Sequence, residues 1–209
     1  MLHSIARFLV VVMGLFALSA SGEDMFCPHI NQGYGPYDYT NPDDRANKLP
    51  IVERYHFTPN IETLQSGNSG TVGGELDYTI RAFPNHHRAL SALARLALKE
   101  KTNKPNGTGA SVECYLDRAT KFQPKDGMVR LIFANYLLKK NNLPLALEQF
   151  EAAEALLPNN INVEYNFGLY YFERKNYDKA YEYAKKAYDR GFPLPGLKNK
   201  LAKVGKWKN

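Results

Sequence analysis

The second half of this chain repeats itself with an offset of 34 residues, the distance from Asp126 to Asn160. Residues 126–158 align with residues 160–192 without a gap, and large and small apolar positions coincide in the two copies. The coinciding pairs are Phe133 with Phe167, Ala134 with Gly168, Leu143 with Tyr177, Ala146 with Ala180, and Ala153 with Ala187. Small residues let two helices approach closely, while large apolar residues fill the space around them. The period therefore predicts an all-α superhelix of stacked helical hairpins.

The same phase extends upstream of the two regular copies. An apolar residue, a small residue and a proline recur at fixed spacing as Leu76, Thr79 and Pro84, as Leu116, Ala119 and Pro124, and as Phe150, Ala153 and Pro158. We therefore expect a half-repeat at 75–84 and repeats at about 86–124, 126–158 and 160–193. A basic helix within 195–209 is expected to cap the array, because a terminal repeat needs a polar outer face.

The repeat pattern resembles the tetratricopeptide repeat (TPR), a helix–turn–helix unit of this length. Motifs before and within the repeats resemble a group of exported proteobacterial TPR proteins. These motifs are Gly35-Pro36-Tyr37-Asp38-Tyr39, His56-Phe57-Thr58-Pro59, Leu76-Asp77-Tyr78-Thr79, Phe83-Pro84-Asn85-His86 and the tail from Gly191 to Leu197. The resemblance implies a periplasmic TPR protein, and it implies no catalytic residues.

The first 22 residues have the composition of a secretory signal peptide. Arg7 precedes an apolar run at 8–18, and small residues follow, so cleavage is expected after Ala20 or Gly22. The apolar run is too short for a lasting membrane span, although an uncleaved anchor is the alternative reading. We expect the mature protein to lie in the periplasm.

Export would place the two cysteines, Cys27 and Cys114, in an oxidising compartment. Two cysteines in such a chain most simply form one disulfide bond. The bond would join the segment before the repeats to the first complete repeat. Two buried thiols or a metal site are the alternatives, and the absence of CxxC spacing argues against structural zinc.

The segment at 23–74 is predicted to be an irregular extension that contains one short helix. Proline, glycine and tyrosine interrupt it too often for a long helix. Thr58 and Pro59 have the order of an N-cap and a first helical residue, which predicts a helix that ends near Gln65. A loop with four glycines is expected at 66–74.

The resemblance to TPR units also indicates a binding surface, because the first helix of each unit lines a concave face. Mapped onto this sequence, the residues favoured for partner binding are Arg88, Arg95, Lys99, Asn135, Lys139, Tyr165 and Asn166. Arginine forks and asparagine amides suit carboxylates and extended peptide backbones. The peptide-carboxylate clamp of chaperone-binding TPR proteins is not matched, since Ser91 and Arg95 stand at its Lys and Asn positions. The alternative is that the chain's own N-terminal extension fills the groove.

No pattern indicates catalysis or a cofactor. The glycine-rich segments at 33–38 and 67–74 lack the features of nucleotide-binding loops, and no histidine pair has metal-ligand spacing. The chain is therefore expected to be a non-catalytic scaffold that binds an envelope protein or peptide, without cofactor or metal. A hydrolase or metal-dependent activity is the first alternative, built on Cys27, His29, His56 and Ser69. A self-assembling structural module is the second.

A net charge of +6 is modest for 209 residues. The C-terminal lysines surround the final helix and form no clean stripe, so they are read as a solvated face. Binding of an anionic surface through this basic C-terminus is a secondary hypothesis. Nucleic acid is not expected as a partner in this compartment.

Overall fold

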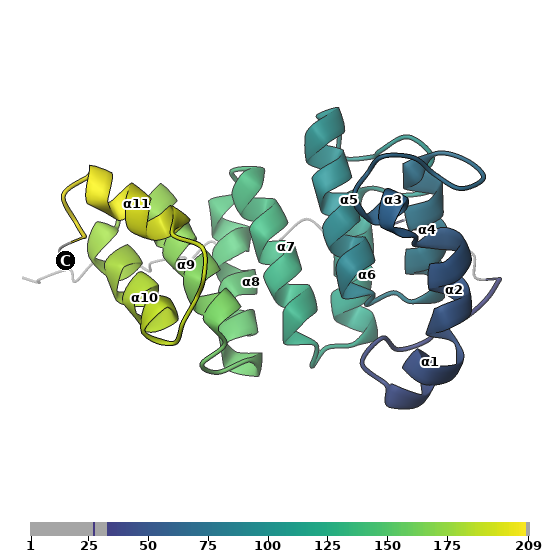
Figure 1. Cartoon of the computed structure of the whole chain (residues 1–209), viewed down its shortest axis with the longest axis horizontal. Coiled ribbons are helices and arrows are strands. Elements are labelled where there is room, and N and C mark those ends of the chain that lie inside the picture. The colour runs from purple at the N-terminus through teal and green to yellow at the C-terminus, as the bar shows by residue number, and fades with distance from the viewer. Residues whose placement is uncertain (1–26, 28–32, 208–209) are drawn as a thin grey trace, which may run out of the picture.

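The computed structural model describes Cys27 and residues 33–207. These residues form an all-α chain in which consecutive helices pack in pairs (Figure 1). The helices are α1 (Pro42–Asn47), α2 (Leu49–His56), α3 (Pro59–Glu62), α4 (Val72–Ala82), α5 (His87–Glu100), α6 (Val112–Phe122), α7 (Gly127–Lys139), α8 (Leu143–Leu156), α9 (Ile161–Glu173), α10 (Tyr177–Asp189) and α11 (Gly196–Lys203). The predicted all-α superhelix of helical hairpins is confirmed.

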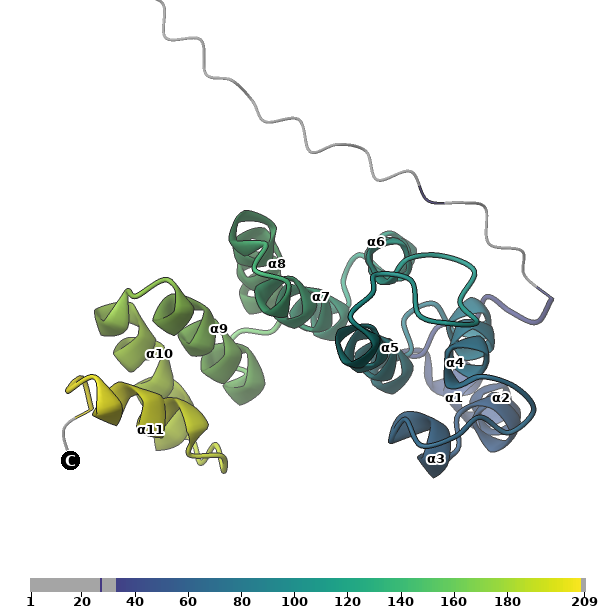
Figure 2. The same ribbon diagram turned by 90° about the horizontal axis from the view of Figure 1, so that it is seen from above.

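The hairpins stack so that α5, α7 and α9 follow one another along one face of the array. Seen from above, the array is bowed, with α3 near one end and α11 near the other end on the same side (Figure 2). Helix α3 contacts α5, and α11 contacts α9. The concave side of the array is therefore bounded at both ends by segments that lie outside the repeats.

The 34-residue period is visible in the local structure. The side chains of Asp126 and Asn160 each accept hydrogen bonds from two main-chain N–H groups at the starts of α7 and α9. The side chains of Asn142 and Asn176 cap α8 and α10, and each accepts a hydrogen bond from one main-chain N–H group. Because the first N–H groups of a helix have no partner within the helix, these four caps fix where the repeat helices begin.

The core follows the small and large positions of the repeat. Ala134 and Gly168 are both buried at the same place in successive units. A Cβ atom on Gly168 would lie 2.6 Å from Cδ2 of Leu197, so the glycine lets α11 pack closely against α9. The rings of Phe150 and Phe167 stack between the two units, with centroids 5.2 Å apart.

The chain before the repeats is more helical than the sequence analysis expects. Residues 42–56 form α1 and α2, because Pro42 and Pro50 each stand in the first turn of a helix, where a missing N–H costs nothing. Helix α4 begins at Val72, inside the expected glycine-rich loop. The side chain of Thr71 caps it by accepting a hydrogen bond from the third main-chain N–H group of the helix. Helix α3 is shorter than predicted.

Cys27 and Cys114 lie at disulfide distance, with their Cα atoms 5.4 Å apart, as the sequence analysis predicts. The pair connects a position before the first helix to α6. The predicted signal peptide at 1–22 lies outside the described residues. Within Cys27 and residues 33–207, no helix combines the length and apolar character that crossing a bilayer requires.

Candidate binding groove

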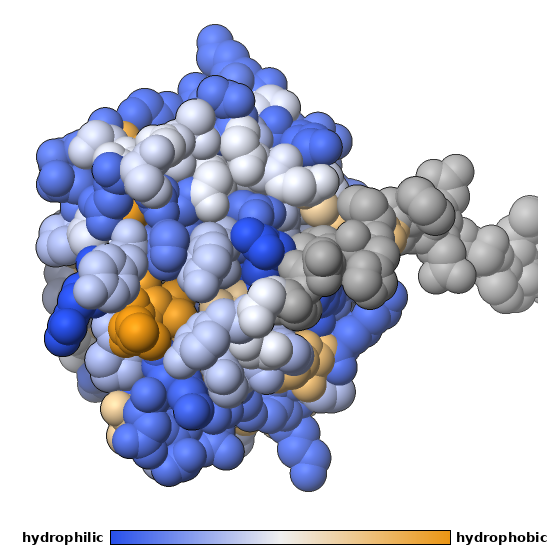
Figure 3. All heavy atoms as spheres, turned by 90° about the vertical axis from the view of Figure 1, so that its right-hand side faces the viewer, coloured by the Kyte–Doolittle hydropathy of each residue, from blue (hydrophilic) through white to orange (hydrophobic). Residues whose placement is uncertain are grey.

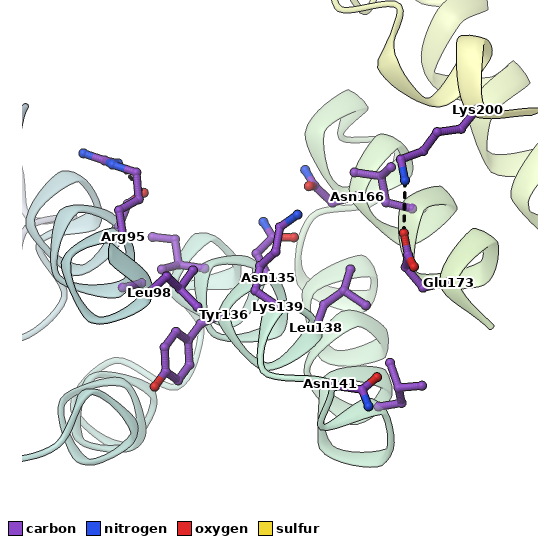
Figure 4. Close-up of a pocket in the computed structure, with 15 residues that line it drawn as sticks. Arg95, Leu98, Asn135, Tyr136, Leu138, Lys139, Asn141, Asn166, Glu173 and Lys200 are labelled. Atoms are coloured by element: carbon purple, nitrogen blue, oxygen red, sulfur yellow. Dashed lines mark hydrogen bonds and ion pairs between the residues drawn. The ribbon is translucent and has the colours of Figure 1, made fainter. Parts of the chain in front are cut away.

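The concave side of the array holds a cavity of about 590 Å³. Side chains from α5, α7 and α9 line most of it, and the start of α8 and one residue of α11 complete it (Figure 4). The helices that the sequence analysis assigned to the concave face therefore do enclose a common space.

The floor of the cavity is apolar. Ala94 and Leu98 come from α5, Ile132 and Leu138 from α7, and Leu169 from α9. Leu98 is 37% exposed, which is unusual for a large aliphatic side chain in a well-packed array. An apolar surface of this kind, open on one side, is typical of a site that receives apolar side chains from a partner.

Polar side chains stand at the rim, and four of them were predicted from the sequence. Arg95, Asn135, Lys139 and Asn166 all line the cavity (Figure 4). Asn166 donates a 2.7 Å hydrogen bond to the main-chain oxygen of Asn162, so its own side-chain oxygen is left to accept. Among the described residues, the side chains of Asn135 and Lys139 have no hydrogen bond or ion pair.

Arg88 and Lys99, also predicted to face a partner, are engaged by the chain itself. Nε of Arg88 donates a 2.8 Å hydrogen bond to Glu62, and Nη1 lies 3.4 Å from Glu53. Nζ of Lys99 donates to the main-chain oxygen of Leu64 at 3.2 Å. The hydrogen bond from Arg88 holds the pKa of Glu62 below its usual range. The α3 region thus occupies the N-terminal end of the concave face.

Tyr165 does not line the cavity. Its ring stacks on Phe192 with centroids 3.9 Å apart, and Tyr188 meets it edge-on. Its hydroxyl would lie 2.8 Å from a Cβ on Gly196, at the start of α11. Tyr165 therefore packs against the C-terminal segment and helps to hold it in place. The repeat alignment does not reveal this contact.

Lys200 is a cavity residue that the sequence analysis did not select. It reaches the cavity from α11 and forms a 3.2 Å ion pair with Glu173 of α9 (Figure 4). Glu173 occupies a concave-face position of the last repeat, but its pairing depends on how α11 folds back over α9. No local pattern specifies that return, so the signal was absent from the sequence.

The extension contributes to the fold more than to the groove. Tyr39 packs on His86 with ring centroids 4.4 Å apart, and its N–H donates a 2.9 Å hydrogen bond to the side chain of Asn85. Asn85 in turn donates to Asp38 at 2.7 Å. These aromatic residues lie at the turn between α4 and α5 and do not line the cavity. Among the described residues of the extension, the α3 region contacts the concave face at α5.

The described residues of the alternative catalytic hypothesis, Cys27, His56 and Ser69, do not assemble into a nucleophile and its base. Nδ1 of His56 lies 2.7 Å from Oε2 of Glu75, while the Ser69 hydroxyl donates to Oε1 of the same carboxylate at 3.0 Å. His56 and Ser69 thus share Glu75 and make no bond to each other. Cys27 is paired with Cys114, and His29 lies outside the described residues. Within the described part of the chain, no group of three or more His, Cys, Asp or Glu side chains could hold a metal ion.

The C-terminal lysines are largely held by contacts within the chain. Lys206 forms a 2.9 Å ion pair with Asp178, and Nζ of Lys198 lies 5.4 Å from the centre of the Trp207 ring. Among the described C-terminal lysines, Lys200 and Lys206 are therefore paired with carboxylates, and Lys198 lies over an aromatic ring. The hypothesis of an anionic surface as partner gains no support from this arrangement.

Comparison with known proteins adds no family. No protein-family model matches the chain, and no curated protein matches it. The functional conclusion therefore depends on the geometry of the groove.

Proposed function

We propose that this chain is a non-catalytic periplasmic scaffold of TPR type that binds a polypeptide segment of an envelope protein. The observation that carries the proposal is the cavity between α5, α7 and α9, with its apolar floor and a polar rim in which Asn135 and Lys139 have no partner among the described residues. Repeat arrays of this shape use their concave face for binding.

The chemistry of the groove suits a polypeptide. The aliphatic floor offers places for apolar side chains, and the amides of Asn135 and Asn166 offer donors and acceptors to a peptide backbone. A site that pairs main-chain hydrogen bonds with apolar subsites gains affinity from the former and specificity from the latter.

The compartment is supported by two features. The composition of residues 1–22 is that of a signal peptide, and disulfide bonds persist in exported proteins. The envelope is therefore where a partner is sought.

The proposal is tested by photo-crosslinking in the cell. A photoreactive amino acid replaces Ile132 in the floor of the groove, and in a matched control it replaces Glu148, an exposed residue of α8 that does not line the cavity. We expect defined envelope proteins to be captured from position 132, not from 148, and to be lost when Leu138→Asp is added. Equal capture from both positions, or none from position 132, would contradict the proposal.

A further inference from the structure

The contacts between the α3 region and α5 indicate which ligand groups the concave face can bind. Arg88 of α5 binds the side-chain carboxylate of Glu62, and Nη2 of Arg95 donates a 2.7 Å hydrogen bond to the main-chain oxygen of the same residue. Lys99 binds the main-chain oxygen of Leu64. Ile61, beside them, is fully buried. The chain's own segment is thus bound through an acidic side chain, carbonyl oxygens and a branched apolar residue.

The cavity presents the same chemistry one helix further along the array. Arg95 uses two of its guanidinium donor groups, Nη1 toward Ser91 and Nη2 toward Glu62, and has further N–H groups to offer. Lys139 of α7 has no partner among the described residues. Its polar end lies with that of Asn135 along one side of the cavity (Figure 4). Ile132 and Leu138 provide the apolar surface beneath.

The charge balance of the lining is positive. Arg95, Lys139 and Lys200 are cationic, and Glu173 is the only acidic residue that lines the cavity within the described chain. Glu173 is already paired with Lys200. A segment that brings a carboxylate to Lys139 would form a charge-assisted hydrogen bond at a partly enclosed site, where such a bond is stronger than at an open surface.

We propose that the groove recognises an internal acidic segment, in which an Asp or Glu side chain stands beside a Leu, Ile or Val residue. This inference rests on the proposed function and names its ligand class. The carboxylate binds at Lys139, in a lining whose positive charge Arg95 increases, and the apolar neighbour enters the floor at Ile132 and Leu138. We assign the carboxylate to a side chain and not to a chain terminus, because the carboxylate that α5 already holds belongs to Glu62, in the middle of a continuous chain.

The test uses a display library of random dodecapeptides. Each peptide is inserted into the display protein and fused to it at both ends, so that no free terminus is present. The mature protein is compared with Lys139→Glu and with Lys140→Glu, a control of equal charge change at an exposed residue outside the cavity. We expect Asp or Glu next to a branched apolar residue in the selected peptides. Lys139→Glu should lower the affinity of a selected synthetic peptide, blocked at both ends, about tenfold. Lys140→Glu should leave it unchanged.

Several results would overturn the inference, and they separate it from the proposed function. Peptides that lose binding on Leu138→Asp but show no acidic preference would disprove the ligand class and keep the groove. A second library presents peptides with a free C-terminus. If peptides bind only with a free C-terminal carboxylate, the ligand class is also disproved and the groove is kept. Equal effects of Lys139→Glu and Lys140→Glu would also disprove the ligand class. If no selected peptide depends on the groove, and position 132 crosslinks nothing in the cell, both proposals fail.

A second hydrophobic surface lies at the N-terminal end of the array. An apolar spot interrupts a largely hydrophilic face there (Figure 3), and Ile51 and Tyr55 of α2 are 52% and 56% exposed. They border a small cavity of about 170 Å³ with Tyr34 and Tyr78. Nothing in the structure shows what covers this surface.

Discussion

The guanidinium of Arg95 donates a 2.7 Å hydrogen bond to the main-chain oxygen of Glu62, and the same side chain lines the open cavity. One arginine therefore serves both the chain's own α3 and the site proposed for a partner. Charge reversal at Arg95 would disturb both at once. Lys139 lines the cavity and has no hydrogen bond or ion pair with any described residue, so it is the cleaner position for testing the groove.

Removing the carboxylate of Glu62 should loosen α3 without unfolding the array. In Glu62→Ala the ion pair to Arg88 is lost, while the main-chain bonds from Arg95 and Lys99 remain. The Arg88 side chain is 49% exposed, so we expect a loss of about 1 kcal/mol or less. Hydrogen exchange at 58–65 should rise up to about fivefold, the ratio that corresponds to this energy.

The control for this change is Arg54→Ala. Arg54 is an exposed residue of α2, so this substitution also removes one charge, but at a site outside α3. It should leave exchange at 58–65 as in the wild type. If Glu62→Ala speeds exchange throughout α5 and α6 as well, the ion pair supports the whole array and not the α3 contact alone.

Loss of the disulfide should lower the stability of the mature protein strongly. Cys27 and Cys114 are 87 residues apart, and closing a loop of that length restricts the unfolded chain by on the order of 4 kcal/mol. Cys27→Ser should therefore shift the urea unfolding midpoint downward. The wild type in reductant should shift by the same amount, while Cys27→Ser should not respond to reductant. A wild-type midpoint that is unaffected by reductant would contradict a formed bond.

The regular repeats could be predicted from the sequence almost residue by residue. The repeats expected at about 86–124, 126–158 and 160–193 are observed as the helix pairs α5–α6, α7–α8 and α9–α10, which span 87–122, 127–156 and 161–189. These pairs follow from periodic apolar positions and from caps, which are local features of the sequence. Four of the seven residues selected for partner binding line the cavity for the same reason.

The ends of the groove could not be predicted, because they depend on contacts between distant segments. Arg88 and Lys99 have the right positions on α5, but they form hydrogen bonds with the α3 region, more than 20 residues earlier. Tyr165 likewise stacks on Phe192 of the C-terminal return instead of facing the cavity. Lys200 reaches the cavity only because α11 folds back onto α9. The periodic pattern of the repeats contains no information about where a non-repetitive segment packs against them.

Stability should fall as the pH drops below about 6.5, through His86. Burial lowers the pKa of His86 from its usual value of 6.5, although the Glu53 carboxylate partly opposes this. Nδ1 accepts a hydrogen bond from the Ala89 N–H at 3.2 Å, so the neutral ring caps α5. Below pH 6.5 the unfolded chain binds a proton that the folded ring resists. The unfolding free energy should therefore decline with acidification, by on the order of 1 kcal/mol per pH unit at most.

The measurement is urea unfolding between pH 7.5 and 5, compared with His86→Asn. Asparagine also caps helices but does not titrate, so the variant should be less stable and its pH profile flatter in this range. The pKa values of Glu53 and Glu62 lie below their usual 4.5 in the folded protein, so their contribution is lost only at lower pH. Identical slopes for the two proteins would exclude His86 as the cause.

Tyr136 should stabilise the groove helix α7 through one buried carboxylate. Its hydroxyl donates a 2.8 Å hydrogen bond to Oε1 of Glu113 on α6, and Oε2 of that carboxylate is buried without a partner. Burial and the nearby carboxylate raise the pKa of Tyr136, so the hydroxyl remains a donor at neutral pH. Tyr136→Phe would leave both oxygens of Glu113 unsatisfied, which typically costs about 1–3 kcal/mol.

A double-mutant cycle separates this bond from the packing of the ring. If the hydrogen bond is the cause, Tyr136→Phe should cost less once Glu113 is replaced by Gln, since a neutral amide tolerates the loss better than a carboxylate. Tyr55→Phe, which removes the hydroxyl of a 56% exposed tyrosine, should leave the unfolding free energy within about 0.5 kcal/mol of the wild type. Because phenylalanine keeps the ring that lines the cavity, peptide binding by Tyr136→Phe should be unchanged. Additive effects of the two substitutions would show that the Tyr136 hydroxyl contributes to stability independently of Glu113.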